Sequence, residues 1–85
     1  MKEIQYTITD PCGLHARPAG ELVRLAQSHQ SQVRMLRGER SCDVKSVLSL
    51  MGLGVRQGET VTVQTTGPDE AEAADAIQAF LSARV

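Results

Sequence analysis

The segment from Cys12 to Gly20, which reads Cys-Gly-Leu-His-Ala-Arg-Pro-Ala-Gly, places the strongest local constraint on the fold. Proline is favoured in the first turn of a helix, where its missing N–H would have no partner anyway. Pro18 therefore predicts a helix that starts close to residue 16, with Gly13 supplying the flexible turn before it. Up to about Gln27, apolar residues recur at three- and four-residue steps and form one buried stripe: Ala19, Leu22, Val23 and Ala26.

His15 stands just before this predicted helix. The unpaired N–H groups and the positive dipole end of a helix N-terminus bind anions, phosphate above all. Arg17 adds a planar guanidinium whose donors suit phosphate oxygens. Because a neutral imidazole is a competent nucleophile near neutral pH, the segment indicates a phosphohistidine site at His15. The alternative is a plain surface residue or helix cap, which is the commoner role of a lone histidine at a helix start.

Four other segments alternate apolar and polar residues with the period of a half-buried strand, at residues 3–8, 32–35, 41–44 and 60–65. The turn Arg37-Gly38-Glu39 joins the second and third of them into a hairpin. Ser46 is a good N-cap for a short helix from about Val47 to Met51 that ends near Gly52.

A last helix is expected to open at Gly67-Pro68-Asp69, with Asp69 and Glu72 at the spacing of a capping pair. Its apolar stripe comprises Ala73, Ala74, Ile77, Phe80 and Leu81. The order of elements is βαββαβα, and the polar strand faces favour an antiparallel sheet covered by helices on one side only. The predicted fold is an α+β open-faced sandwich. We expect Gly20 to pack closely against a neighbour and His29 to lie in an exposed loop.

Size and composition limit the classes of function that the chain could have. Eighty-five residues predict a single domain over residues 1–85, with a monomer as the default state. A net charge of −1 and the near absence of aromatic residues argue against nucleic acid as a principal partner. The longest apolar run is too short to cross a bilayer, and the N-terminus lacks a signal-peptide core. We therefore expect a cytoplasmic protein without membrane insertion, and its two cysteines do not suggest a structural disulfide.

Two stretches resemble the histidine-containing phosphocarrier family, HPr, of the phosphoenolpyruvate–sugar phosphotransferase system. Residues 13–19, Gly-Leu-His-Ala-Arg-Pro-Ala, resemble its active-site signature. Residues 45–55 resemble its regulatory-serine segment at the expected separation. Two motifs in register are more specific than either alone, and the similarity covers essentially the whole chain. The resemblance implies an antiparallel sheet with the strand order 1-4-2-3.

The resemblance also implies a phosphoryl relay without a cofactor. His15 would accept a phosphoryl group from phosphorylated Enzyme I and pass it to sugar-specific IIA components, so the protein would be a carrier and not an enzyme. The amides of Ala16 and Arg17 and the Arg17 side chain would stabilise the phosphoryl group. Pro18 would help to set the helix start.

A docking surface is the second implied feature. Val47, Leu48 and Met51 share one face of the short helix, whereas Leu50 and Leu53 point elsewhere, to the core. In a chain this small the shared face could be buried, but the resemblance implies that it docks on partners. The implied docking residues are Leu14, Arg24, Val47, Leu48 and Met51. A basic rim suited to acidic-rimmed partners is formed by Arg17, Arg24 and Lys45.

Ser46 has two roles open to it. As an N-cap it contributes about 1 kcal/mol and needs no further purpose. The resemblance implies regulatory phosphorylation by a kinase, reversed by a phosphorylase and read by a transcription regulator. The added charge would spoil docking beside the apolar face.

Two alternatives to the relay stay open. The chain could be mainly a regulatory phosphotransfer module, in nitrogen-related or carbon catabolite control. His15 could be the general base of a catalyst, although the sequence near it offers no obvious acid partner. Cys12, where many family members carry a small polar residue, has metal-ligand spacing to His15, but a zinc site needs three or four ligands and no metal is expected.

Overall fold

The computed structural model describes all residues 1–85 and has the predicted element order βαββαβα. The strands are β1 (Lys2–Thr7), β2 (Gln32–Arg37), β3 (Arg40–Asp43) and β4 (Thr60–Thr66). The helices are α1 (Ala16–Gln27), α2 (Val47–Gly52) and α3 (Glu70–Arg84). The start of α1 at Ala16 and the Ser46 N-cap of α2 confirm the two boundaries drawn from Pro18 and Ser46.

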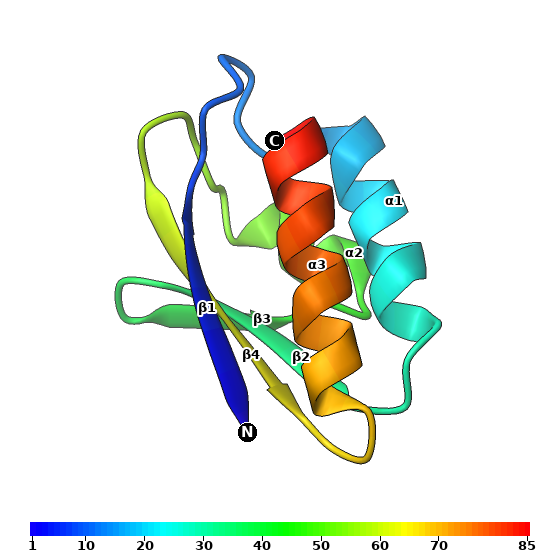
Figure 1. Ribbon diagram of the computed structural model, residues 1–85. Helices are drawn as coiled ribbons and strands as arrows, with labels where there is room; N and C mark the ends of the chain where they lie inside the picture. The colour runs from blue at the N-terminus through cyan, green and yellow to red at the C-terminus, as the bar shows by residue number, and fades with distance from the viewer.

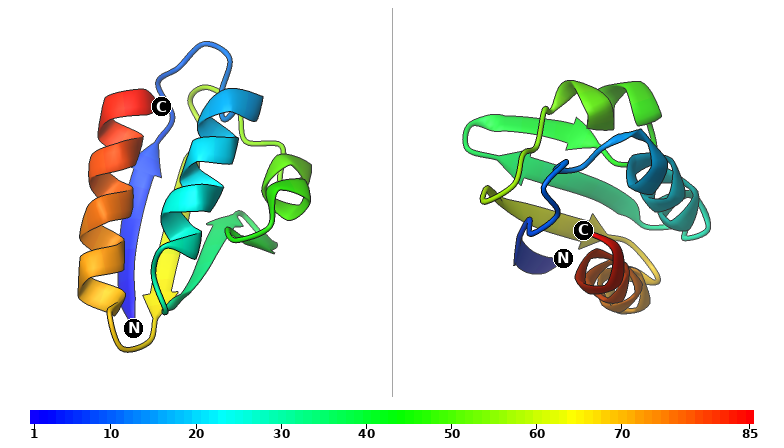
Figure 2. Two further views of the ribbon diagram at one scale, coloured as in Figure 1. Left: turned by 90° about the vertical axis from the view of Figure 1, so that its right-hand side faces the viewer. Right: turned by 90° about the horizontal axis from the view of Figure 1, so that it is seen from above.

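The four strands form one antiparallel sheet in the order β1-β4-β2-β3. Val63 of β4 lies opposite Ile4 of β1 and Met35 of β2, so apolar residues of three strands share one face. The helices cover that face alone, with α1 and α3 side by side (Figures 1 and 2). The structure is the expected α+β open-faced sandwich.

The core lies between the sheet and the helices. Leu22, Met35 and Ile77 are each fully buried there, and they come from α1, β2 and α3. Leu50 and Leu53 also point into the core, as the sequence predicted. His29 is half-buried and not exposed as predicted, and its ring Nδ1 lies 3.1 Å from the carbonyl oxygen of Leu25. None of the three helices has the length and apolar character needed to cross a membrane.

Two further local predictions are wrong. A Cβ added at Gly20 would meet nothing within 4 Å, so this glycine does not serve a close helix contact. Asp69 makes no capping bond to the first turn of α3. Its carboxylate instead accepts hydrogen bonds from the loop before β2: the N–H groups of Gln30 (3.1 Å) and Ser31 (2.9 Å) and the Ser31 hydroxyl (2.5 Å). Glu70 accepts from the Gly67 N–H at the start of the helix.

The Asp69 contacts predict a pH dependence of stability. The hydrogen bond from the Ser31 side chain, with those from the Gln30 and Ser31 amides, lowers the pKa of Asp69 from 3.8 to about 2. Because the pKa falls on folding, this contribution is present above about pH 4 and is lost as the pH falls toward 2. We expect Asp69→Asn to lower the free energy of unfolding at neutral pH, measured by urea denaturation. The difference from wild type should shrink below pH 4, and a difference independent of pH would contradict this assignment.

Candidate functional site

The N-terminus of α1 presents unpaired backbone donors beside His15. His15 is the N-cap residue, with extended backbone angles (φ −89°, ψ 179°) and no side-chain bond to the helix. Its carbonyl oxygen accepts the first helical hydrogen bond, from the Ala19 N–H at 3.0 Å. The N–H groups of Ala16 and Arg17 have no partner, and Pro18 has none to offer. Two free amides and the positive end of the helix dipole therefore lie in the turn that directly follows His15, as an anion site requires.

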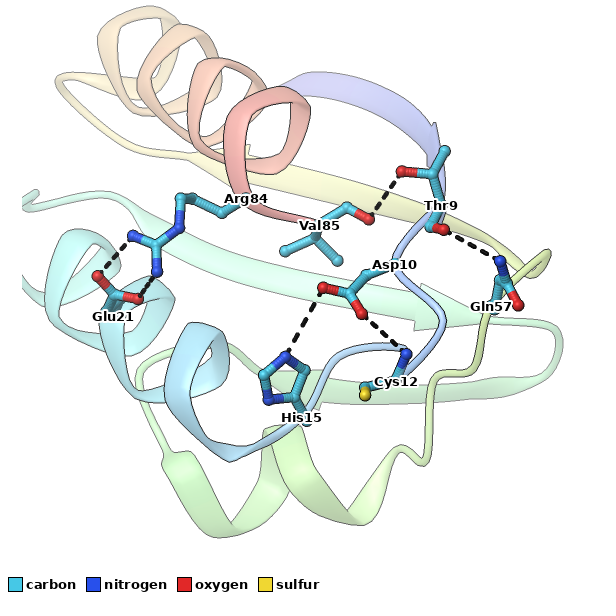
Figure 3. A network of polar contacts seen from close by, with 8 residues as sticks. All are labelled: Thr9, Asp10, Cys12, His15, Glu21, Gln57, Arg84 and Val85. Atoms are coloured by element: carbon cyan, nitrogen blue, oxygen red, sulfur yellow. Dashed lines mark hydrogen bonds and ion pairs between the residues drawn. The ribbon is translucent and has the colours of Figure 1, made fainter.

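The His15 ring is partly exposed and has an acidic neighbour. Its side chain is 43% exposed, and Nε2 lies 3.7 Å from Oδ2 of Asp10 (Figure 3). The expectation that no acid partner lies near His15 is therefore wrong. Asp10 precedes His15 by five residues, and the turn between them brings the two side chains together.

The turn that carries Asp10 is fixed from three directions. The backbone N–H of Asp10 donates to the carbonyl oxygen of Val85 (2.8 Å), and the Asp10 carbonyl oxygen accepts from the Gly13 N–H (2.8 Å). The Oδ1 atom accepts from the Cys12 N–H at 2.8 Å. The Leu14 N–H donates to the carbonyl oxygen of Val55 (3.1 Å), which ties the far end of the loop to the segment before β4. These hydrogen bonds hold the loop to Val85 and to the segment before β4.

Gly13 is required by this loop, and Gly20 offers the matched comparison. Gly13 has φ +66°, and a Cβ there would lie 2.5 Å from the Val55 carbonyl oxygen. We expect Gly13→Ala to destabilise the fold by about 2 kcal/mol or more, because the backbone must move. Gly20→Ala enters open space in a helix and should stabilise it by roughly 1 kcal/mol. Urea unfolding of both variants checks the pair, and equal effects would contradict the clash.

Arg17 is exposed and makes no ion pair. The acid one turn later, Glu21, is held by Arg84 of α3, with contacts of 2.6 and 2.8 Å (Figure 3). The Arg84 hydrogen bond is also the largest cause of the lowered pKa of Glu21, and the charges of Arg24 and Arg17 add to it. Ala16, Arg17, Gly20, Glu21 and Arg24 line a shallow hollow on α1. Because Arg84 occupies Glu21, the Arg17 guanidinium is free for an incoming anion.

An apolar surface lies on α2, the helix that contacts α1. Val47, Leu48 and Met51, hereafter the α2 patch, are 44%, 84% and 41% exposed. The alternative that these residues are buried is therefore wrong. Leu14 is only 6% exposed and belongs to the core, so the structure removes it from the implied docking surface. Of the basic rim, Lys45 is engaged, since its Nζ donates to the His29 carbonyl oxygen at 2.8 Å.

Cys12 is exposed at the turn, where its backbone N–H is the group that bonds to Asp10. No group of three His, Cys, Asp or Glu side chains is placed to hold a metal ion. Sequence reasoning missed Asp10, Val85 and the Glu21–Arg84 pair. The sequence signal for Asp10 was weak: a carboxylate within a turn's length of the candidate nucleophile. No sequence signal marked Val85, because its contact with Asp10 joins residues that are far apart in the sequence.

Comparison with known proteins identifies the family of the chain. The PTS-HPr family model, described as the "PTS HPr component phosphorylation site", matches residues 2–83. The phosphocarrier protein HPr of Cupriavidus necator is 46% identical over 84 residues, which cover 99% of this chain and 94% of that protein. An HPr crystal structure from Thermoanaerobacter tengcongensis has a TM-score of 0.93 at 36% identity, covering 98% of this chain and 93% of that one. Crh, the Bacillus subtilis catabolite repression protein, has a TM-score of 0.79 at 32% identity, covering 100% and 98%. The chain belongs to the HPr family, the phosphocarrier proteins of the phosphotransferase system.

Proposed function

We propose that His15 accepts a phosphoryl group from phosphorylated Enzyme I and passes it to sugar-specific IIA components in the cytoplasm. The observation that carries this proposal is the exposed imidazole at the start of α1, beside two free amides and the unpaired Arg17. Charge-assisted hydrogen bonds from these groups would each contribute roughly 1.5–3 kcal/mol before competition with solvent. The protein acts as a relay whose own residue is transiently modified.

The Asp10 contact favours one ring nitrogen as the acceptor. A phosphoryl group on Nε2 would bring two negative charges against the Asp10 carboxylate, which lies 3.7 Å from that atom. Transfer to Nδ1 avoids this repulsion. In the proposed step the Nδ1 lone pair attacks the phosphorus of the donor phosphohistidine. The donor's N–P bond breaks, and its electron pair stays on the donor imidazole.

The α2 patch supplies the surface for docking. Its three apolar side chains lie on α2, which contacts α1, so a partner that covers the patch lies next to the helix that His15 caps. Arg17 and Arg24 add positive charge on the α1 side, where they suit partners with acidic rims. Met51 is an adaptable contact of the kind found at surfaces that bind several partners in turn.

Labelling with radioactive phosphoenolpyruvate tests the proposal. We expect the protein to take up an acid-labile label only when Enzyme I is present, and to lose it to an added IIA component. Acid lability identifies a phosphoramidate, because phosphoserine survives acid. If the wild-type protein takes up no label, the relay proposal is wrong.

Phosphorylation of Ser46 is a second, regulatory candidate, favoured by the position of this residue. Its hydroxyl accepts from the Ser49 N–H at 3.3 Å and is only partly buried, directly before the α2 patch. A phosphate there would add roughly −1.5 to −2 charges beside the docking surface. It would repel acidic-rimmed partners while the helix N-terminus tolerates it. The structural likeness to Crh, a catabolite repression protein, accords with a regulatory role.

Two Ser46 variants separate capping from regulation. Ser46→Ala should lower the free energy of unfolding by about 1 kcal/mol through loss of the cap. It should also abolish any acid-stable label introduced by ATP and a cell extract of the source organism. Ser46→Asp keeps a capping oxygen and should slow phosphoryl acceptance from Enzyme I at unchanged stability. If Ser46→Asp accepts phosphate at the wild-type rate, charge at this position does not regulate docking.

A further inference from the structure

Given the proposed function, we infer that Asp10 is a positioning residue that holds a proton on Nε2 of His15 and so leaves the Nδ1 lone pair bare for the phosphoryl group. This inference rests on the distance of 3.7 Å between Oδ2 of Asp10 and Nε2 of His15. This separation exceeds a hydrogen bond, and such contacts in a resting site tighten when the reacting group gains charge.

Asp10 is built to keep that orientation. Its Oδ1 atom is occupied by the Cys12 N–H at 2.8 Å, so only Oδ2 is left to face the ring. Its backbone is fixed at the N–H by Val85 and at the carbonyl by Gly13. Its side chain is 27% exposed, and that of His15 is 43% exposed, so the pair sits at the surface without being freely solvated. A carboxylate has only acceptors, so the ring nitrogen facing it is the one that carries a proton.

The same contact shapes the transfer step. When the phosphoryl group is on Nδ1 and Nε2 is protonated, the ring is a cation that the Asp10 carboxylate stabilises. An acceptor nucleophile attacks phosphorus, the Nδ1–P bond breaks, and its electron pair returns to Nδ1. The departing ring is then neutral imidazole with its proton still on Nε2. In hydrolysis the nucleophile is water, and the products are neutral His15 and dihydrogen phosphate. Without the Nε2 proton the leaving group would be an imidazolate, which departs far less readily.

Asp10→Asn should move the ring proton of His15 from Nε2 to Nδ1, with little change in the shape of the side chain at position 10. The Cys12 N–H needs an acceptor, so it holds the asparagine Oδ1 atom in the place of the aspartate oxygen. The asparagine amide group then presents N–H donors to Nε2, which favours a bare Nε2 and a proton on Nδ1. Asp75→Asn is the matched control, because it removes the same charge from an exposed position on α3 that makes no hydrogen bond or ion pair.

Nitrogen-15 NMR spectra of the His15 ring, taken at alkaline pH where the ring is neutral, read the tautomer directly. We expect the Nε2–H form in wild type and in Asp75→Asn, with a shift toward the Nδ1–H form in Asp10→Asn. Backbone spectra establish that the variants keep the fold. A ring spectrum of Asp10→Asn equal to that of the control overturns the inference.

Hydrolysis of the phosphorylated protein gives the second readout. Each variant is loaded chemically with phosphoramidate, so that no partner protein is needed, and loss of phosphate is followed by phosphorus-31 NMR. We expect hydrolysis in Asp10→Asn to be roughly two- to fivefold slower than in wild type, the range given by a partly exposed ion pair of up to about 1 kcal/mol. The rates are compared at a pH where the phosphorylated ring is only partly protonated, because there the loss of the carboxylate lowers the fraction of rings that carry the Nε2 proton and can leave as neutral imidazole. An equal or faster rate overturns the inference.

If wild type is labelled by Enzyme I but Asp10→Asn behaves as the control, only the role of Asp10 fails. If wild type takes no label from Enzyme I, the proposed relay fails, while the ring spectra still report on Asp10.

Discussion

The His15→Ala variant is expected to take up no acid-labile label from phosphoenolpyruvate and Enzyme I. The chain has one other imidazole, His29, which follows α1 at its C-terminal end. The helix dipole is negative there and disfavours a phosphoryl group. The His29 ring also contacts the Leu25 carbonyl oxygen through Nδ1, at 3.1 Å. The two histidines thus lie at opposite ends of α1, and only His15, at the N-terminal end, is placed where the helix dipole favours a phosphoryl group.

His29→Ala is the matched control and should be labelled like wild type. His15 makes no side-chain bond to the helix, so alanine should change the free energy of unfolding by no more than about 0.5 kcal/mol. Loss of label in His15→Ala would then reflect lost chemistry and not lost fold. Label retained in His15→Ala, or lost in His29→Ala, would place the phosphoryl group elsewhere.

The sequence was sufficient for features that depend on near neighbours. Pro18 limits where α1 can begin, and α1 begins at Ala16 with His15 as its N-cap. The serine before the second apolar helix caps it as its type predicts. Alternation in the strands marked the residues that face the core, since period two is a property of extended backbone. The strand order came from the family resemblance, because alternation does not say which strands pair.

The parts that escaped prediction depend on contacts between distant segments. Asp10 lies close to His15 in a loop whose backbone is hydrogen-bonded to Val85, a residue far from it in the sequence. Leu14 directly precedes the partly exposed His15, yet its side chain is buried in the core. Asp69 has the spacing of a helix cap, but the nearby Ser31 offers its carboxylate better donors. For Asp69 local spacing allowed the predicted role and tertiary packing selected another, whereas packing buries Leu14, whose role the resemblance implied, and brings Asp10, for which no role was predicted, beside His15.

The charge pattern along α1 depends on a similar long-range contact. Glu21 lies four residues after Arg17, a spacing at which the two would pair on an isolated helix. Arg84 on α3 takes up Glu21 instead, and the ring of Phe80 lies 5.9 Å from the Arg84 guanidinium. Arg17 therefore keeps its donors free. The ion pair between the helices thus preserves positive charge at the proposed phosphoryl site, although neither Glu21 nor Arg84 forms an ion pair with His15.

Arg17→Ala is expected to slow phosphoryl acceptance from Enzyme I by roughly 10²–10³-fold, the usual loss when one donor to a developing anion is removed. Arg17→Lys should recover only part of the rate, because an ammonium keeps the charge but not the two-pronged donor geometry. Arg24→Ala removes the same charge two turns further along the hollow and should cost far less. Rapid-quench measurement of labelling, with urea unfolding to check the fold, distinguishes the three variants. Equal rates for Arg17→Ala and Arg24→Ala would mean that Arg17 adds only to the general positive field of the docking surface. A rate for Arg17→Lys equal to wild type would show that its charge alone is used.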